Sequence, residues 1–187
     1  MTGKNKREAL EHWLANRHFK PVGELMPVSP ASWTEFYKLT MHPDKTIAWH
    51  ALWTCERYCR KNPSFFAEKQ HEIATQAMQC SHKGMKRLWL NMLLFLPVET
   101  ANNVTFLDFC LQNMCAPHEP SAIQSVCMKL AYKLCCQNAD LLNELTACLT
   151  NMELEYYTPA VQATHKNTLK SIIRLQHQKN KKTKNYV

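Results

Sequence analysis

The stretch TIAWHALWTCERYCR, Thr46–Arg60, carries the pattern that decides the fold. Its residues Ile47, Ala51 and Cys55 are four positions apart, which is the spacing of one face of an α-helix. The same face recurs at a fixed interval along the chain. Steps of 38 residues connect Ala9, Ile47, Met85, Ile123 and Val161. A period of this length, with helical spacing inside each copy, predicts stacked pairs of helices.

Three further columns of residues follow the same step. They comprise Trp13, Ala51, Trp89, Cys127 and His165; Arg17, Cys55, Leu93, Ala131 and Leu169; and Lys20, Tyr58, Leu96, Leu134 and Ile172. From the second copy onward these columns are apolar nearly throughout, with His165 as the exception. We therefore expect them to form the core between neighbouring helices.

Composition and breaking residues favour an all-α chain. Only three glycines are present, and residues with high helix propensity are plentiful. The predicted helices span about 4–17, 31–41, 46–60, 65–80, 83–96, 103–114, 121–137, 139–152 and 159–178. Asp44 and Ser64 are placed to cap the helices that follow them, and Pro159 falls in a first turn, where proline is tolerated. The pattern thus predicts a lone first helix followed by four helix pairs.

Paired helices at this period, with DKTIAWHALW at the start of a second helix, resemble the HEAT/armadillo family over about Ala31–Leu175. The resemblance implies a right-handed α–α superhelix of about four helix pairs plus an N-terminal helix. It also implies that the second helices line the concave side. The arginine that this family places near the start of the second helix is matched loosely by Lys86-Arg87. In the other copies it is replaced by Ala48, Gln124 and Gln162.

The arc of each second helix opposite the core columns should then face outward. The residues that we expect to bind a partner on this arc are Trp49, Trp53, Arg57, Arg60, Arg87, Asn91, Lys129, Tyr132 and Lys133. Its columns also include Glu56 and continue in the last copy to Ala163, Asn167, Lys170 and Ser171. Tryptophans four residues apart, followed by an arginine, form a ridge suited to flat or anionic groups. The alternative is that the N-terminal helix or a loop covers the indole rings.

The net charge of +8 is concentrated at the two ends of the chain. Ten of the 23 basic residues lie within 1–7 and 166–187, and the segment between carries 13 basic against 15 acidic residues. We therefore expect a single helical repeat domain over 1–178 and a basic disordered tail over 179–187. The alternative reading of the tail is a phosphate-binding arm.

The sequence contains no catalytic or cofactor motif. It lacks a nucleotide-binding glycine loop, a nucleophile elbow and paired metal-ligand spacings, so we expect no catalytic residue, no metal and no cofactor. The nine cysteines lie mainly at apolar repeat positions, where reduced thiols act as small core residues. No apolar run approaches the roughly 20 residues that cross a bilayer. We expect a cytoplasmic protein.

The leading hypothesis is a non-enzymatic scaffold whose concave groove binds an acidic and apolar protein or peptide segment. The alternative is a nucleic-acid-binding protein related to the DNA-alkylation-repair glycosylases of the HEAT-like class. That resemblance implies tryptophans, an arginine and an aspartate; Trp49, Trp53 and Arg87 fit the first two roles, but neither Glu56 nor Asp44 matches the acidic motif. A third hypothesis is self-assembly through apolar ends of the repeat.

Overall fold

A computed structural model describes residues 3–15, 30–97 and 104–184. Within these ranges the chain forms α-helices and short 3₁₀-helices, and no strand is present. The predicted all-α class is confirmed. The chain divides into two compact units, residues 1–68 and 69–187, and each unit is described by itself.

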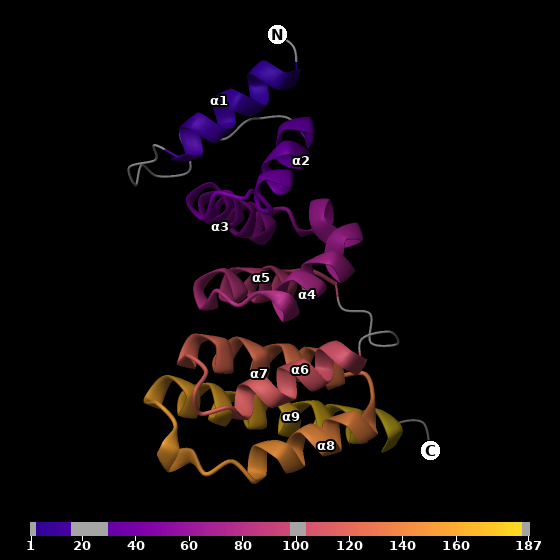
Figure 1. The fold of residues 1–187 in the computed structure, drawn as a ribbon. Coiled ribbons are helices and arrows are strands. Elements are labelled where there is room, and N and C mark those ends of the chain that lie inside the picture. The colour runs from indigo at the N-terminus through magenta and orange to yellow at the C-terminus, as the bar shows by residue number, and fades with distance from the viewer. Residues whose placement is uncertain (1–2, 16–29, 98–103, 185–187) are drawn as a thin grey trace. The chain divides into compact units, whose positions relative to one another are not determined.

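The first unit contains three α-helices and most of a 3₁₀-helix. These are α1 (Gly3–Ala15), α2 (Pro30–Leu39), α3 (Lys45–Lys61) and η2 (Pro63–Lys69). Helix α3 packs against both α1 and α2 (Figure 1). The predicted cap is confirmed, because Asp44 Oδ1 accepts hydrogen bonds from the backbone N–H groups of Thr46 and Ile47 at 2.7 and 3.2 Å. These two bonds lower the pKa of the Asp44 carboxyl.

An aromatic cluster forms the core of the first unit. The ring of Trp33, on α2, stacks on that of Tyr58, on α3, with centroids 3.7 Å apart and planes 8° from parallel. The rings of Phe65 and Phe66, on η2, meet Tyr58 edge-on. Trp33 is only 2% exposed, so the stack fixes the position of α2 on α3.

The second unit consists of two layers of helices. Its elements are α4 (Gln70–Gln79), α5 (Lys83–Phe95), α6 (Val104–Cys115), α7 (Ser121–Cys135), α8 (Ala139–Thr150), η3 (Leu154–Tyr156) and α9 (Pro159–Lys184). Helices α4 and α5, α6 and α7, and α8 and α9 pack as pairs. The second members of the pairs also pack on one another in the order α5, α7, α9, behind α4, α6 and α8 in the view of Figure 1.

Most members of the predicted core columns in the second unit are buried, and Leu169 is half-buried. Ile123 and Val161 lie buried near the starts of α7 and α9, and Met85 is half-buried at the start of α5. The remaining buried members in the second unit are Trp89, Leu93, Leu96, Cys127, Ala131, Leu134, His165 and Ile172. The polar exception has a partner, since His165 Nε2 lies 2.9 Å from the carbonyl oxygen of Leu149 on α8. Ala9 and Trp13 have side chains outside the described part of the chain.

Two boundaries differ from the sequence prediction by more than two residues. The helix expected over 65–80 begins as η2, and α4 starts only at Gln70; Ser64 therefore lies inside η2 and caps nothing. The tight turns of η2 bring Phe66 into the aromatic core, where it is buried. At the other end, α9 continues beyond the expected end at 178 to Lys184, because no Gly or Pro interrupts it. Residues 185–187 lie outside the described residues, and the division into domain and tail stays a prediction.

None of the described helices combines the length and the apolar character that crossing a membrane demands.

Candidate functional site

The expected binding residues fall into two groups, one in each unit. Trp49, Trp53, Arg57 and Arg60 lie on α3 of the first unit. Those of the second unit lie on α5 and α7, and they are Arg87, Asn91, Lys129, Tyr132 and Lys133. Each group has its own geometry, and a groove that continues from one unit to the other stays a prediction.

On α3, an arginine lies on a tryptophan as the four-residue spacing predicts. The guanidinium carbon of Arg57 is 4.2 Å from the ring centroid of Trp53, which is a cation–π contact. Trp49 and Trp53 are both half-buried, so a part of each indole ring remains accessible. Arg57 itself is exposed. This ridge presents an aromatic edge beside a cation.

The expectation that Glu56 faces outward is wrong. Its side chain is only 6% exposed, and its Oε1 lies 3.0 Å from Nη2 of Arg60. A carboxylate can be buried when a cation pairs with it, and Arg60 sits one turn away on the same helix. The pairing also means that part of the hydrogen-bonding capacity of Arg60 is used within α3.

Lys133 has a partner inside the protein. Its Nζ donates hydrogen bonds to the backbone carbonyl oxygens of Leu93 at 3.2 Å, of Leu94 at 2.8 Å and of Leu96. These carbonyls belong to the end of α5, where the last groups of a helix have no intrahelical donor. A cation there also compensates the negative end of the helix dipole. Lys133 thus joins α7 to α5.

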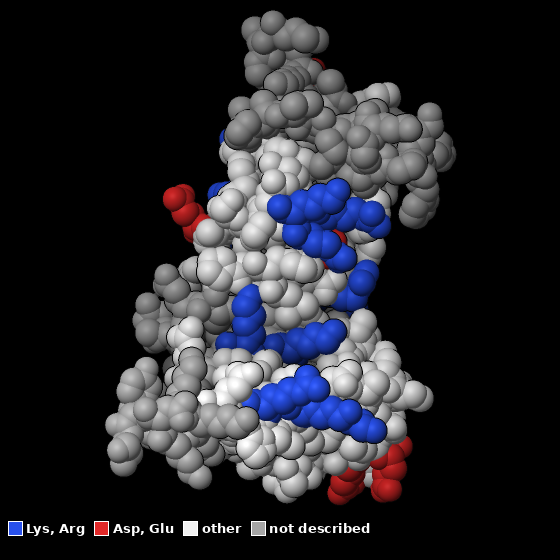
Figure 2. Space-filling view, turned by 180° about the vertical axis from the view of Figure 1, so that it is seen from behind, with Lys and Arg blue, Asp and Glu red and all other residues white. Residues whose placement is uncertain are grey.

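Charge is segregated between the two layers of the second unit. In its described part, every Lys and Arg except Lys69 lies on α5, α7 or α9, and these three helices contain no Asp or Glu. The acidic residues that the structure describes in this unit lie on the other helices or in connections: Glu72, Asp108, Glu119, Asp140, Glu144, Glu153 and Glu155. Figure 2 views the side of α5, α7 and α9, where basic side chains of this unit spread across the face and acidic ones lie at its edge.

Some of these cations are neutralised locally. Lys83 Nζ bonds Glu119 Oε1, and Lys86 Nζ lies 3.8 Å from the same oxygen and 5.6 Å from the ring centroid of Phe109. Glu119 is buried, and its Oε2 has no hydrogen-bond partner in the described part of the chain. Among the side chains that the structure describes, the cations of these three helices outside the contacts given above are Arg87, Lys129, Lys166, Lys170 and Arg174.

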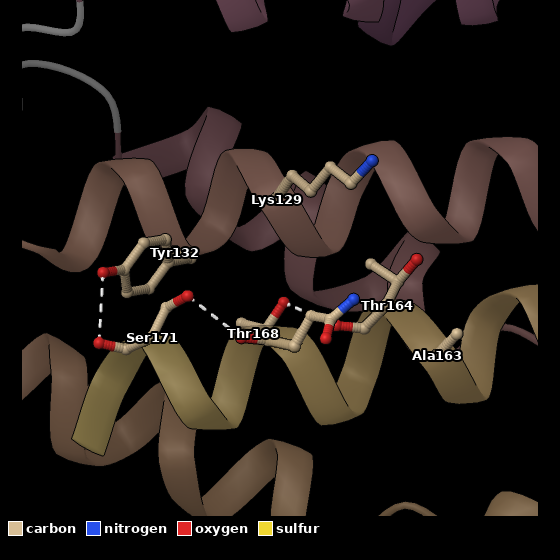
Figure 3. Close-up of a pocket in the computed structure, with 7 residues that line it drawn as sticks. Lys129, Tyr132, Ala163, Thr164, Thr168 and Ser171 are labelled. Carbon is tan, nitrogen blue, oxygen red and sulfur yellow. Dashed lines mark hydrogen bonds between the residues drawn. The ribbon is translucent and has the colours of Figure 1, made fainter. Parts of the chain in front are cut away.

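A cavity of about 300 Å³ lies between α7 and α9 on this same face (Figure 3). Its walls are formed by Lys129, Tyr132, Ala163, Thr164, Asn167, Thr168 and Ser171. The sequence prediction named Lys129 and Tyr132 as binding residues. It also placed Ala163, Asn167 and Ser171 of α9 on the outward columns. It missed Thr164 and Thr168, which directly follow Ala163 and Asn167 in the sequence.

The phenol of Tyr132 forms a neutral wall of this cavity. Its hydroxyl lies 3.4 Å from the backbone carbonyl oxygen of Ser171 (Figure 3). Burial, with a contribution from the neighbouring Cys136 thiol, raises the pKa of Tyr132 to about 12. The phenol therefore keeps its proton at neutral pH. It adds no negative charge to the side of α5, α7 and α9, which is called the basic face below.

The cysteines are structural groups in this arrangement. None of the nine, all of which lie in the described part of the chain, forms a disulfide bond, and burial raises the pKa of the Cys55, Cys110 and Cys135 thiols. A thiol with a raised pKa carries little thiolate, the form that reacts and binds metals. Among the described residues, no group of three or more His, Cys, Asp or Glu side chains is placed to hold a metal ion.

The paired helices, the regular step between them and the acid-free face of the second layer define an α–α helical repeat protein. A family model described as HEAT repeat domain matches residues 6–172. The chain belongs to this family. Comparisons with curated proteins and with solved structures give no match.

Proposed function

We propose that this protein is a non-enzymatic scaffold that binds an acidic and apolar segment of a partner protein. HEAT repeat domains typically serve in protein interactions. The contact surfaces in this proposal are the face of α5, α7 and α9 in the second unit and the Trp53–Arg57 ridge in the first. The partner's acidic side chains meet the cations, and its apolar side chains meet the exposed part of the indole rings.

The segregation of charge in the second unit is the observation that carries this proposal. Three neighbouring helices without a single acidic residue create a positive surface. Among the described residues, the carboxylate that pairs with its lysines is the buried Glu119 beside Lys83 and Lys86. Charge complementarity of this kind selects anionic partners and speeds their association. The half-buried Trp53 beneath Arg57 adds the aromatic and cationic groups that are enriched at interface hot spots.

The test compares the proteins captured by the wild-type chain with those captured by a variant of each surface. Arg87→Glu with Lys170→Glu alters the second unit, and Trp53→Ala alters the first. We expect the first variant to lose acidic partners, because two attractive charges become repulsive. Trp53→Ala should weaken the binding of the same partners. Quantitative mass spectrometry of the captured proteins measures both effects.

A matched control changes charge on the other layer. Asp140→Lys with Glu144→Lys alters two exposed residues of α8 and leaves the face of α5, α7 and α9 unchanged. It should retain the partners of the wild type. Unchanged partners in the Arg87→Glu/Lys170→Glu variant would show that this face is not the binding surface.

Nucleic acid is the second candidate partner, and the run of lysines near the end of α9 favours it. Positions 179, 181, 182 and 184 are all lysine, and phosphates bind such clusters without sequence preference. A relation to DNA-alkylation-repair glycosylases belongs to this candidate. Gel shifts at several salt concentrations, with and without residues 179–187, distinguish nonspecific binding by the lysine-rich end from binding by the face of α5, α7 and α9. Binding that disappears with these residues is tail electrostatics, and binding that survives their removal but is lost with Arg87→Glu assigns nucleic acid to the helical face.

A further inference from the structure

The cavity between α7 and α9 differs from the rest of the basic face in the hydrogen bonds that its walls can still make. The hydroxyls of Thr164 and Thr168 donate to the carbonyl oxygens four residues earlier, Ala160 and Thr164, at 3.0 and 2.9 Å. Ser171 does the same with Asn167 at 3.0 Å (Figure 3). A hydroxyl whose proton is used in this way can still accept. The three oxygens on α9 therefore call for a ligand that donates hydrogen bonds.

The opposite wall supplies a cation. Lys129, on α7, is exposed and lines the cavity, and among the described residues it forms no ion pair or hydrogen bond through its ammonium. Neither α7 nor α9 contains an acidic residue that could neutralise it. The side-chain amide of Asn167 adds one donor group and one acceptor. The site thus pairs a positive charge with a row of acceptors.

Few ligand groups satisfy both walls at once. A fully ionised phosphate offers acceptors only, so it can use Lys129 but not the hydroxyl oxygens of α9. An acidic residue within an extended polypeptide offers a carboxylate together with backbone N–H groups on either side. A cavity of about 300 Å³ is also the size of a small recognition pocket, large enough for a side chain and its flanking backbone.

We propose that this cavity binds an Asp or Glu side chain of an extended segment, with the carboxylate on Lys129 and the neighbouring backbone N–H groups at the hydroxyl oxygens of Thr164, Thr168 and Ser171. This inference rests on the proposed function, and it names the anchor residue that the partner must supply. Packed helices lie about 8–10 Å apart. A segment in the extended polyproline II conformation rises about 3.1 Å per residue with three residues per turn, so acidic residues spaced by three lie on one side, about 9 Å apart, and match successive helices of the face.

The experiment titrates the full ¹⁵N-labelled chain with a synthetic peptide of repeated Gly-Ser-Glu triplets and follows backbone amide shifts by NMR. The expected result is a set of shifts centred on Lys129, Thr164 and Thr168. A peptide of Gly-Ser-Gln triplets has the same backbone without the charge and should bind at least about tenfold more weakly, as expected for the loss of a charged hydrogen bond.

Two variants test the two walls. Lys129→Gln should weaken binding of the Glu peptide about tenfold, by the same loss of a charged hydrogen bond. Thr168→Val keeps the shape of a buried side chain and removes its oxygen, and it should weaken binding by a few-fold. The matched control is Lys45→Gln, which removes the same charge from an exposed residue at the start of α3 that neither lines the cavity nor belongs to the proposed binding face. It should change the affinity by less than about twofold.

Three outcomes overturn the inference. The first is binding of the Glu peptide to the Lys129→Gln variant with wild-type affinity, and the second is an absence of shifts on α7 and α9. The third is that oligothymidylate, in place of the Glu peptide, binds in a Lys129-dependent manner, which would assign the cavity to phosphate. If Arg87→Glu with Lys170→Glu weakens peptide binding while Lys129→Gln keeps the wild-type affinity, the first of these outcomes has occurred: the cavity proposal fails, and the face of α5, α7 and α9 remains the proposed surface.

Discussion

Nζ of Lys133, on α7, lies 2.8 Å from the backbone carbonyl oxygen of Leu94, on α5. The same ammonium also donates to the carbonyl oxygens of Leu93 and Leu96. A side chain of one repeat therefore caps the C-terminal end of the second helix of the preceding repeat. This contact is a cross-link between two neighbouring elements of the same layer, and it holds the positions of the cations that they display.

Replacing Lys133 by methionine should destabilise the protein. The variant keeps most of the apolar stem but leaves carbonyl oxygens at the end of α5 without their charged donor. We expect the free energy of unfolding to fall by about 1.5–3 kcal/mol, which is the usual cost of a hydrogen bond to a charged group. Urea denaturation measures it. Lys129→Met, at an exposed position of the same helix, should change it by less than about 0.5 kcal/mol; equal effects would contradict the capping role.

Removing the stacked tryptophan should damage the first unit. Trp33→Ala deletes a ring that is 2% exposed and lies 3.7 Å, centroid to centroid, from Tyr58. Because a cavity replaces the ring, the free energy of unfolding should fall by about 3–5 kcal/mol. Thermal and urea denaturation followed by circular dichroism measure this change. Trp49→Ala removes the same ring at a half-buried position, and a loss as large as that of Trp33→Ala would refute the proposed core role of Trp33.

Stability should decrease at alkaline pH. Burial raises the pKa of the Cys135 thiol to about 12 from its ordinary value of 9.0. Below pH 9 both the folded and the unfolded chain hold this proton, so this thiol does not make the free energy of unfolding depend on pH. From about pH 9 to about 12 only the unfolded chain releases it, so the free energy of unfolding falls by up to about 1.4 kcal/mol per pH unit for this thiol.

Chemical denaturation at pH 7, 9, 10 and 11 provides the measurement for the thiol. The Cys135→Ala variant should show a shallower fall above pH 9 than the wild type, because the group that titrates is gone. Cys80→Ala, at the end of α4, serves as the matched control and should follow the wild-type slope. A wild-type slope in both variants would mean that Cys135 does not contribute to the loss of stability above pH 9.

The contact between Arg57 and Trp53 should be measurable as a coupling energy. A double-mutant cycle with Arg57→Met and Trp53→Leu isolates the pair from its surroundings. At an exposed site we expect a coupling of about 0.5–1 kcal/mol in unfolding free energy. Arg60→Met combined with Trp53→Leu supplies the comparison, since Arg60 pairs with Glu56. A coupling there as large as that of Arg57 would remove the case for a specific cation–π contact.

The sequence predicted the helices and the core well, because both depend on local spacing. The apolar columns and the Asp44 cap are read from short intervals along the sequence. The cap is confirmed, and most described members of the columns are buried, with Tyr58, Met85 and Leu169 half-buried. The end of α9 was missed because a run of lysines can form either a tail or a helix. The start of α4 was missed because tertiary packing of Phe66, which local propensity does not include, favours the tighter turns of η2.

The candidate site was only partly accessible to sequence reasoning. Counting charge along the chain placed the basicity at the ends, whereas sorting the same residues by helix reveals the acid-free layer of α5, α7 and α9. The roles of Lys133 and Glu56 required coordinates, since a side chain on an outward arc can still bend back to a carbonyl group or pair within its own helix. Thr168 was missed because it belongs to neither the core columns nor the outward ones.

The two oppositely charged layers of the second unit also give it an electric dipole moment that runs across the helices. An anionic molecule that diffuses nearby experiences a torque as well as an attraction, so more of its encounters begin in a productive orientation. Dissolved ions shorten the range of this guidance, and capture of such a molecule should be fastest in dilute buffer and slower at physiological ionic strength.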